Sequence, residues 1–177
     1  MSVAELHELA ISLRPWEESD AEAVYEACQD LEIQHWIPVI PRPYTREDAA
    51  AFVTGALQLG PHQFAIVENG EVVGSIGMGV NAQQTGHIGY WCASAARGRG
   101  VTTTALRLLS RYAFDELGLE RLELVTDPDN RASQRVAEKV GYRREGILRS
   151  HIRHRDGRRR DSVMFSLLPG ELALSAT

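Results

Sequence analysis

Residues 85–104 read TGHIGYWCASAARGRGVTTT, and this stretch decides the fold. Its first part, Thr85–Cys92, contains β-branched and aromatic residues and predicts a strand. A helix is expected from about Gly100 to Leu117, because apolar residues recur there at helical spacing. Between them, the connection Arg97-Gly98-Arg99-Gly100 lets the backbone approach a ligand closely, and the free amides of the following helical turn favour an anion.

This glycine-rich connection can be interpreted in two ways. It is neither a dinucleotide fingerprint, which needs a third glycine, nor a P-loop, which needs Gly-Lys-Ser/Thr. Arg97 and Arg99 add positive charge, and the hydroxyls of residues 102–104 add donors, so the segment suits a pyrophosphate. The alternative is an ordinary strand-to-helix turn with solvated arginines.

A second informative block begins at Asp127-Pro128-Asp129-Asn130, a turn after the strand expected at Leu122–Thr126. Asn130 can cap a helix over Arg131–Val140, and Gly141 stands at the usual glycine position past the end of that helix. Ser133 then lies in the first turn. Capping for Asn130 and an ordinary third-position serine for Ser133 are the purely structural alternatives.

The rest of the chain alternates strands and helices. The expected elements are a strand at Ile11–Arg14, a helix capped by Ser19-Asp20 and ending near Gln29, an irregular packed loop over Leu31–Pro43, a helix from the Thr45/Asp48 capping box to about Leu59, strands at Gln63–Glu68 and Glu71–Val80 joined by an Asn69-Gly70 turn, and strands at Tyr142–Leu148 and Asp161–Leu168 joined near Asp156-Gly157. This order predicts an α/β (α+β) protein with one mixed sheet and helices on both faces. Residues 1–177 are expected to form a single domain with its core at about 9–169.

Composition narrows the class of protein. The 177 residues are 44% hydrophobic and 24% charged, as in a soluble globular domain, and the net charge of −5 disfavours nucleic acid as a partner. No apolar run is long enough for a membrane span, and Met1–Ala10 lacks a signal peptide pattern. Cys28 and Cys92 predict free thiols in a reducing cytoplasm, and the scattered histidines predict no metal site.

The two informative blocks resemble the GNAT N-acetyltransferases, most closely the RimJ/RimL-like branch. Ile88-Gly89-Tyr90-Trp91 runs into Arg97-Gly98-Arg99-Gly100, which matches the Arg-x-x-Gly-x-Gly/Ala acyl-CoA loop of that family. The second block, Asp129–Ser133 through Lys139–Tyr142, stands at the family's spacing. The resemblance covers nearly the whole chain, and two separate blocks make chance agreement improbable.

The resemblance implies a mostly antiparallel sheet whose middle strands, Thr85–Cys92 and Leu122–Thr126, splay apart. Acetyl-CoA or another short acyl-CoA is then the co-substrate, with no metal, and a homodimer is usual in this branch. The residues that the resemblance implies for cofactor binding are Tyr90, Cys92, Arg97, Gly98, Arg99, Gly100, Val101, Thr102 and Asn130. Thr102 departs from the family, which usually has Gly or Ala at that position.

The resemblance also implies the catalytic residues, Ser133 and Asn130. Many family members carry a tyrosine seven residues after the asparagine as general acid, but this chain has Ala137 there. In the RimJ/RimL branch a serine in the place of Ser133 is thought to take that role. The general base stays open between Glu32, His35 and His151, because Ile152 stands where some relatives have glutamate. Cys92 is expected to be a buried thiol and not a nucleophile, since these enzymes transfer the acyl group directly.

The acceptor is the least determined part. Glu32, Trp36 and Tyr44 are the candidate substrate-binding residues, although aromatic packing in a long loop explains the last two equally well. The basic run Arg149–Arg160 is either a solvated hairpin or a steering patch. By resemblance the favoured acceptor is an N-terminal α-amine of a protein, ahead of a small-molecule amine such as an antibiotic, polyamine or amino acid. A non-catalytic acyl-CoA-binding protein and an RNA-binding module are the competing hypotheses.

Overall fold

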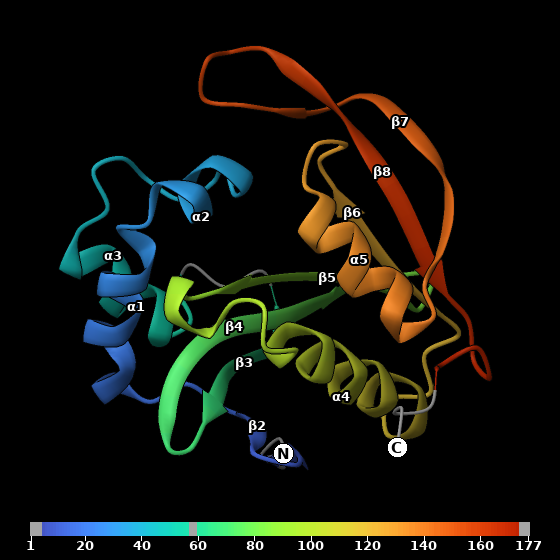
Figure 1. Ribbon diagram of the computed structural model, residues 1–177, viewed down its shortest axis with the longest axis horizontal. Helices are drawn as coiled ribbons and strands as arrows, with labels where there is room; N and C mark the ends of the chain where they lie inside the picture. Colours follow the sequence, from blue (N-terminus) through green and yellow to red (C-terminus); the bar gives the residue numbers. More distant parts are fainter. Residues whose placement is uncertain (1–4, 57–59, 174–177) are drawn as a thin grey trace.

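The computed structural model describes residues 5–56 and 60–173, and a mixed sheet runs through this part of the chain (Figure 1). Its eight strands lie in the order β1-β2-β3-β4-β5-β6-β8-β7. All adjacent strands are antiparallel except β5 and β6, which are parallel. The bounds are β1 Leu6–Glu8, β2 Ile11–Arg14, β3 His62–Glu68, β4 Glu71–Val80, β5 Thr85–Cys92, β6 Arg121–Thr126, β7 Arg143–Arg153 and β8 Arg159–Leu167.

Helices cover both faces of the sheet, as the sequence predicted. The bounds are α1 Ala21–Cys28, α2 Leu31–Trp36, α3 Arg46–Val53, α4 Val101–Asp115 and α5 Arg131–Val140. Alternate residues of β5 separate the two cores: Ile88 packs with α4, whereas Trp91 packs with the cluster under α1–α3. Figure 1 shows α1–α3 gathered at one side of the molecule, with α4 and α5 lying across the sheet.

Local signals account for most of the element boundaries. Thr45 and Asp48 form the predicted capping box of α3. Asn69 and Gly70 have φ of 52° and 86°, the backbone conformation of the two-residue turn predicted between β3 and β4. The β3–β4 ladder shifts register beside Gly74, in the strand where glycines predicted a bulge. The predicted helix ends at Gln29 and Leu117 lie within two residues of the observed ends.

Several predicted elements were wrong. The segment Leu31–Pro43, predicted to be irregular, begins with the helix α2. Asp30 caps this helix by accepting a hydrogen bond from the Glu32 amide at 2.8 Å. The first proline comes only at residue 38, so it does not interrupt the helix. Helix α3 ends at Val53, well before the predicted end at Leu59, which lies outside the described residues. Strands β7 and β8 extend further toward their hairpin than predicted, and β1 was not predicted at all.

The splay between β5 and β6 is the feature that positions the site. The two strands pair from Thr85 to Ile88 and no further, although β5 continues to Cys92. The Ala93 amide donates to Val73 of β4 at 2.9 Å, and backbone groups alternate in direction along a strand, so those of Tyr90 and Cys92 point away from β4 into the gap. An opened ladder therefore leaves backbone groups available to a ligand.

Candidate active site

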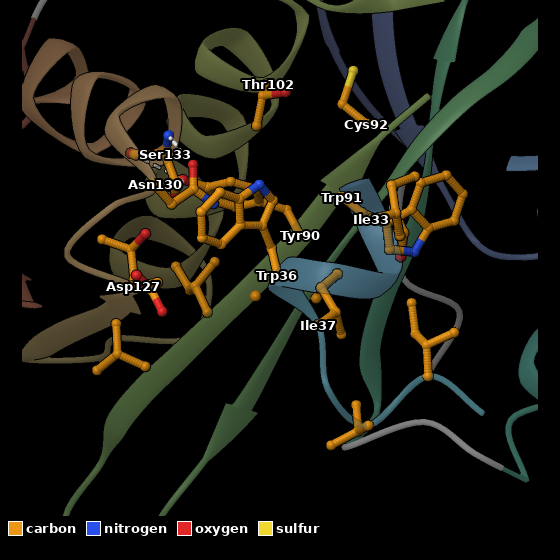
Figure 2. A pocket seen from close by; sticks show the side chains of 18 of the residues that line it. Ile33, Trp36, Ile37, Tyr90, Trp91, Cys92, Thr102, Asp127, Asn130 and Ser133 are labelled. Atoms are coloured by element: carbon orange, nitrogen blue, oxygen red, sulfur yellow. Dashed lines mark hydrogen bonds between the residues drawn. The ribbon is translucent and has the colours of Figure 1, made fainter. Parts of the chain in front are cut away.

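A cavity of about 660 Å³ opens at the splay. Its walls come from the end of β5, the helix α2 with the loop after it, the first turn of α5, and the β7–β8 hairpin. Figure 2 labels side chains from β5, α2 and the start of α5, among them Tyr90, Trp36 and Ser133, and shows Asp127 near them. The cavity has the size and mixed lining of a small-molecule site.

The glycine-rich loop borders this cavity and leaves room for a ligand. Gly98 and Gly100 have φ of 76° and 83°, in the left-handed region, and a Cβ added at either would meet nothing within 4 Å. Helix α4 has no side-chain cap, and its first intrahelical bond runs from the Thr104 amide to Gly100. Within residues 5–56 and 60–173, the amides of residues 101–103 have no hydrogen-bond acceptor. A helix start of this kind, with open space before it, fits a diphosphate.

Both arginines of the loop are engaged in ion pairs. Arg97 donates at 2.7 Å to Asp30 and at 2.7 Å to Glu32, and its Nε donates to the Cys92 carbonyl at 3.1 Å. Arg99 pairs with Glu68 at 2.6 Å. The charge that the sequence assigned to a pyrophosphate is thus partly neutralised, and Arg97 ties the loop to the start of α2.

Asn130 and Ser133 stand together at the start of α5. Asn130 Oδ1 accepts a hydrogen bond from the Ser133 amide at 3.1 Å, which confirms the predicted cap. Ser133 Oγ lies 2.9 Å from the hydroxyl of Tyr90 and forms a hydrogen bond with it. The two residues are 43 positions apart, so no local sequence pattern predicts this bond. Burial raises the pKa of Tyr90 to about 12, so its hydroxyl is protonated at neutral pH.

The cavity wall formed by α2 and the loop after it is largely apolar. Trp36 lines the cavity together with Ile33 and Ile37. Tyr44 also borders the cavity, but its side chain is buried and bonded to Cys28. Burial raises the pKa of Cys28 to about 11 and raises that of Tyr44 as well. Tyr44 therefore supports the wall from behind, while Glu32 borders the cavity in its ion pair with Arg97.

The candidate general bases lie in different surroundings. His35 is exposed and stacks edge-on against Trp36, and His151 is exposed and bonded to Ser162 Oγ at 3.1 Å. Neither borders the cavity, whereas His154 does. Burial and the nearby Arg160 guanidinium lower the pKa of His154.

His154 and Asp127 are cavity residues that the sequence interpretation missed. Asp127 follows the end of β6 directly and accepts a hydrogen bond from the Asp129 amide at 2.9 Å, and its carboxylate lies 3.9 Å from Arg160. The sequence did contain a signal for Asp127, because this residue directly follows a predicted strand and stands three residues before Asn130. For His154 there was none, because its place depends on how the hairpin folds over the cavity.

The basic hairpin reaches across the cavity to the loop after α2. Arg155 donates to the carbonyls of Ile37 and Ile40, which lie on the opposite wall. In Figure 1 the β7–β8 hairpin arches toward α2. Arg155, at least, therefore links the β7–β8 hairpin to the loop after α2.

An opened sheet beside a glycine loop at an uncapped helix start is the arrangement that the sequence led us to expect of a CoA-dependent acyltransferase. The family model of the acetyltransferase (GNAT) domain matches residues 11–143, and the chain therefore belongs to the GNAT family of acetyltransferases.

Individual relatives agree with this assignment. The chain is 29% identical to p20 of Bacillus licheniformis, described as an uncharacterized N-acetyltransferase, over 92% of this chain and 95% of that protein. A shorter stretch of 72 residues is 46% identical to YjcK of Bacillus subtilis, but it spans 41% of this chain and only 40% of YjcK. The structure of Mycobacterium smegmatis RimJ in complex with CoA-disulfide superimposes with a TM-score of 0.83 and 29% identity, over 98% of this chain and 90% of that one.

Two features are absent from the part of the chain that the structure describes. Residues 5–56 and 60–173 contain no helix long and apolar enough to cross a membrane. The same residues contain no group of three or more His, Cys, Asp or Glu side chains placed to hold a metal ion.

Proposed function

We propose that this GNAT enzyme transfers the acetyl group of acetyl-CoA to the N-terminal α-amine of a protein or peptide, by direct attack in a ternary complex. The observation that carries the chemistry is the open space at Gly98 and Gly100 with the unbonded amides of residues 101–103, next to backbone groups exposed by the splay. The protein acceptor rests on the resemblance to the RimJ/RimL branch and on the likeness to RimJ.

The residues take the following roles in this proposal. The amides of residues 101–103 hold the diphosphate, and the backbone of Tyr90 and Cys92 holds the pantetheine. A backbone amide of the same strand stabilises the negative charge that develops on the thioester oxygen. Asn130 shapes the start of α5, and Ser133 donates a hydrogen bond or proton to the departing sulfur. Holding the amine and the thioester together supplies much of the rate.

Ser133→Ala tests the enzyme role. We expect kcat to fall at least about tenfold, because the leaving sulfur loses its donor, while the dissociation constant of acetyl-CoA stays within about twofold. The measurement is thiol release from acetyl-CoA with unblocked peptides, the same peptides acetylated at the α-amine, spermidine and an aminoglycoside. Turnover with unblocked peptides alone supports the proposed acceptor, and turnover with the small amines alone would replace it.

A binding experiment separates the non-catalytic alternative. A ligand present at about 100 times its dissociation constant, and bound only by the native state, adds about 2.7 kcal/mol to the unfolding free energy. Stabilisation by acetyl-CoA and CoA without turnover of any amine would favour an acyl-CoA-binding protein. A homodimer and a cytoplasmic location remain predictions, and light scattering of the purified chain tests the first.

A further inference from the structure

The hydroxyls of Tyr90 and Ser133 face each other across the splay. Tyr90 belongs to the part of β5 beyond its last pair with β6, and Ser133 belongs to α5. Their oxygens are 2.9 Å apart, and Tyr90 Oη also lies 3.4 Å from the Ser133 carbonyl oxygen. Both side chains border the cavity, and Figure 2 shows them beside Asn130.

The direction of this hydrogen bond decides what Ser133 can do. Each hydroxyl carries one proton. If Ser133 donates to Tyr90, the tyrosine proton turns to the Ser133 carbonyl and the serine has nothing left for the cavity. If Tyr90 donates to Ser133 Oγ, the serine proton is free. Among the residues that the structure describes, Ser133 Oγ has no other hydrogen-bond partner.

We propose that Tyr90 is a positioning residue for acetyl transfer: its hydroxyl donates to Ser133 Oγ and thereby turns the serine proton toward the departing sulfur. The inference rests on the proposed function. Chains of hydrogen bonds strengthen one another in a site shielded from water, so the serine becomes a better donor to developing negative charge.

The step balances without a further reactant. The amine nitrogen forms a bond to the acetyl carbon, the bond from that carbon to sulfur breaks, and the electron pair leaves with the sulfur. The amine releases one proton and the thiol gains one. Tyr90 keeps its own proton, in agreement with the raised pKa of its buried hydroxyl.

A second tyrosine–serine pair in the same protein shows what a purely structural contact looks like. Tyr142 Oη lies 2.9 Å from Ser110 Oγ, and that serine also donates to the Leu106 carbonyl at 2.7 Å. The Ser110 proton is therefore already engaged in a hydrogen bond. The side chains of Tyr142 and Ser110 are both buried, with exposed fractions of 3% and 0%. Neither borders the cavity. Tyr142→Phe is therefore a matched control for Tyr90→Phe.

Kinetics of the two variants test the inference. We expect Tyr90→Phe to lower kcat about five- to twentyfold with the KM for acetyl-CoA within about twofold, and the double variant with Ser133→Ala to be no slower than Ser133→Ala alone. Tyr142→Phe should keep kcat within about twofold while lowering the melting temperature. A normal kcat for Tyr90→Phe, or effects that multiply in the double variant, would overturn the inference.

A titration of bound CoA needs no acceptor amine, so its result does not depend on whether the proposed function is correct. The thiol of bound CoA is titrated by its ultraviolet absorbance. A donated hydrogen bond should make its pKa about one unit lower in the wild type than in Tyr90→Phe or Ser133→Ala, and these two variants should agree. Ionisable cavity groups such as Arg97, Asp127 and His154 are common to all variants, so their effects cancel. Equal thiol pKa values in the wild type and in Tyr90→Phe would overturn the inference. A lower thiol pKa in the wild type, found together with no turnover of any amine, would overturn only the proposed function.

Discussion

The proposed cofactor side and the proposed acceptor side of the cavity are built by different means. The cofactor side uses backbone: left-handed glycines at 98 and 100, uncapped helix amides, and a strand end released from its neighbour. The acceptor side uses side chains of α2, its following loop and the β7–β8 hairpin, held by Arg97 and Arg155. A backbone site tolerates many changes of neighbouring side chains, whereas an acceptor wall made of side chains changes with each substitution. Substitutions should therefore be able to weaken acetyl-CoA binding and acceptor binding separately.

The largest expected effect comes from filling the space before α4. Gly100→Asp places a carboxylate where the diphosphate is proposed to lie, so we expect acetyl-CoA to bind at least about 100-fold more weakly, as measured by calorimetry. The matched variant is Gly70→Asp, because Gly70 has a φ of 86° against 83° for Gly100 and is equally open. Both variants carry the same backbone strain of about 1 kcal/mol. A similar loss of affinity in both would show that strain, not the site, is responsible.

The same contrast explains what the sequence could predict. The glycine loop and the Asn130 cap are recorded in short runs of residues, because a left-handed backbone and a helix cap each need a particular residue at one position. The ion pairs of Arg97 join residues 65 and 67 positions apart, and the Tyr90–Ser133 pair spans 43. Such contacts form only once the chain has folded, so the sequence predicted neither the ion pairs of Arg97, nor the Tyr90–Ser133 hydrogen bond, nor the place of His154 at the cavity.

Helix α2 escaped prediction for a related reason. The run Leu31–Trp36 is too short to show clear helical spacing, and the prolines just after it favour a loop. Its cap at Asp30 is also one of the two carboxylates that Arg97 binds. The helix is therefore stabilised in part by a residue of the cofactor loop.

An intermediate effect is expected where the two sides are joined. Arg97→Gln removes the ion pairs to Asp30 and Glu32 and leaves two carboxylates at the start of α2. These pairs are partly exposed, so their loss should loosen α2 modestly and raise the acceptor KM roughly fivefold, with a smaller change in acetyl-CoA affinity. Arg99→Gln removes the same charge from the same loop but touches only Glu68. If both variants raised the acceptor KM equally, loss of charge rather than the link to α2 would be the cause.

The smallest effect is expected at Cys92, which also borders the cavity. Burial raises the pKa of this thiol, although Thr102, Arg97 and Arg99 oppose the shift. A raised pKa keeps the thiol protonated through neutral pH, and the reactive thiolate forms only as the pH rises further. Cys92→Ala should therefore keep kcat within about twofold, and wild-type enzyme incubated with acetyl-CoA should show no acetyl adduct at Cys92 by mass spectrometry. A loss of tenfold or more together with an adduct in the wild type would mean that the acyl group passes through the cysteine, and direct attack by the amine would have to be abandoned.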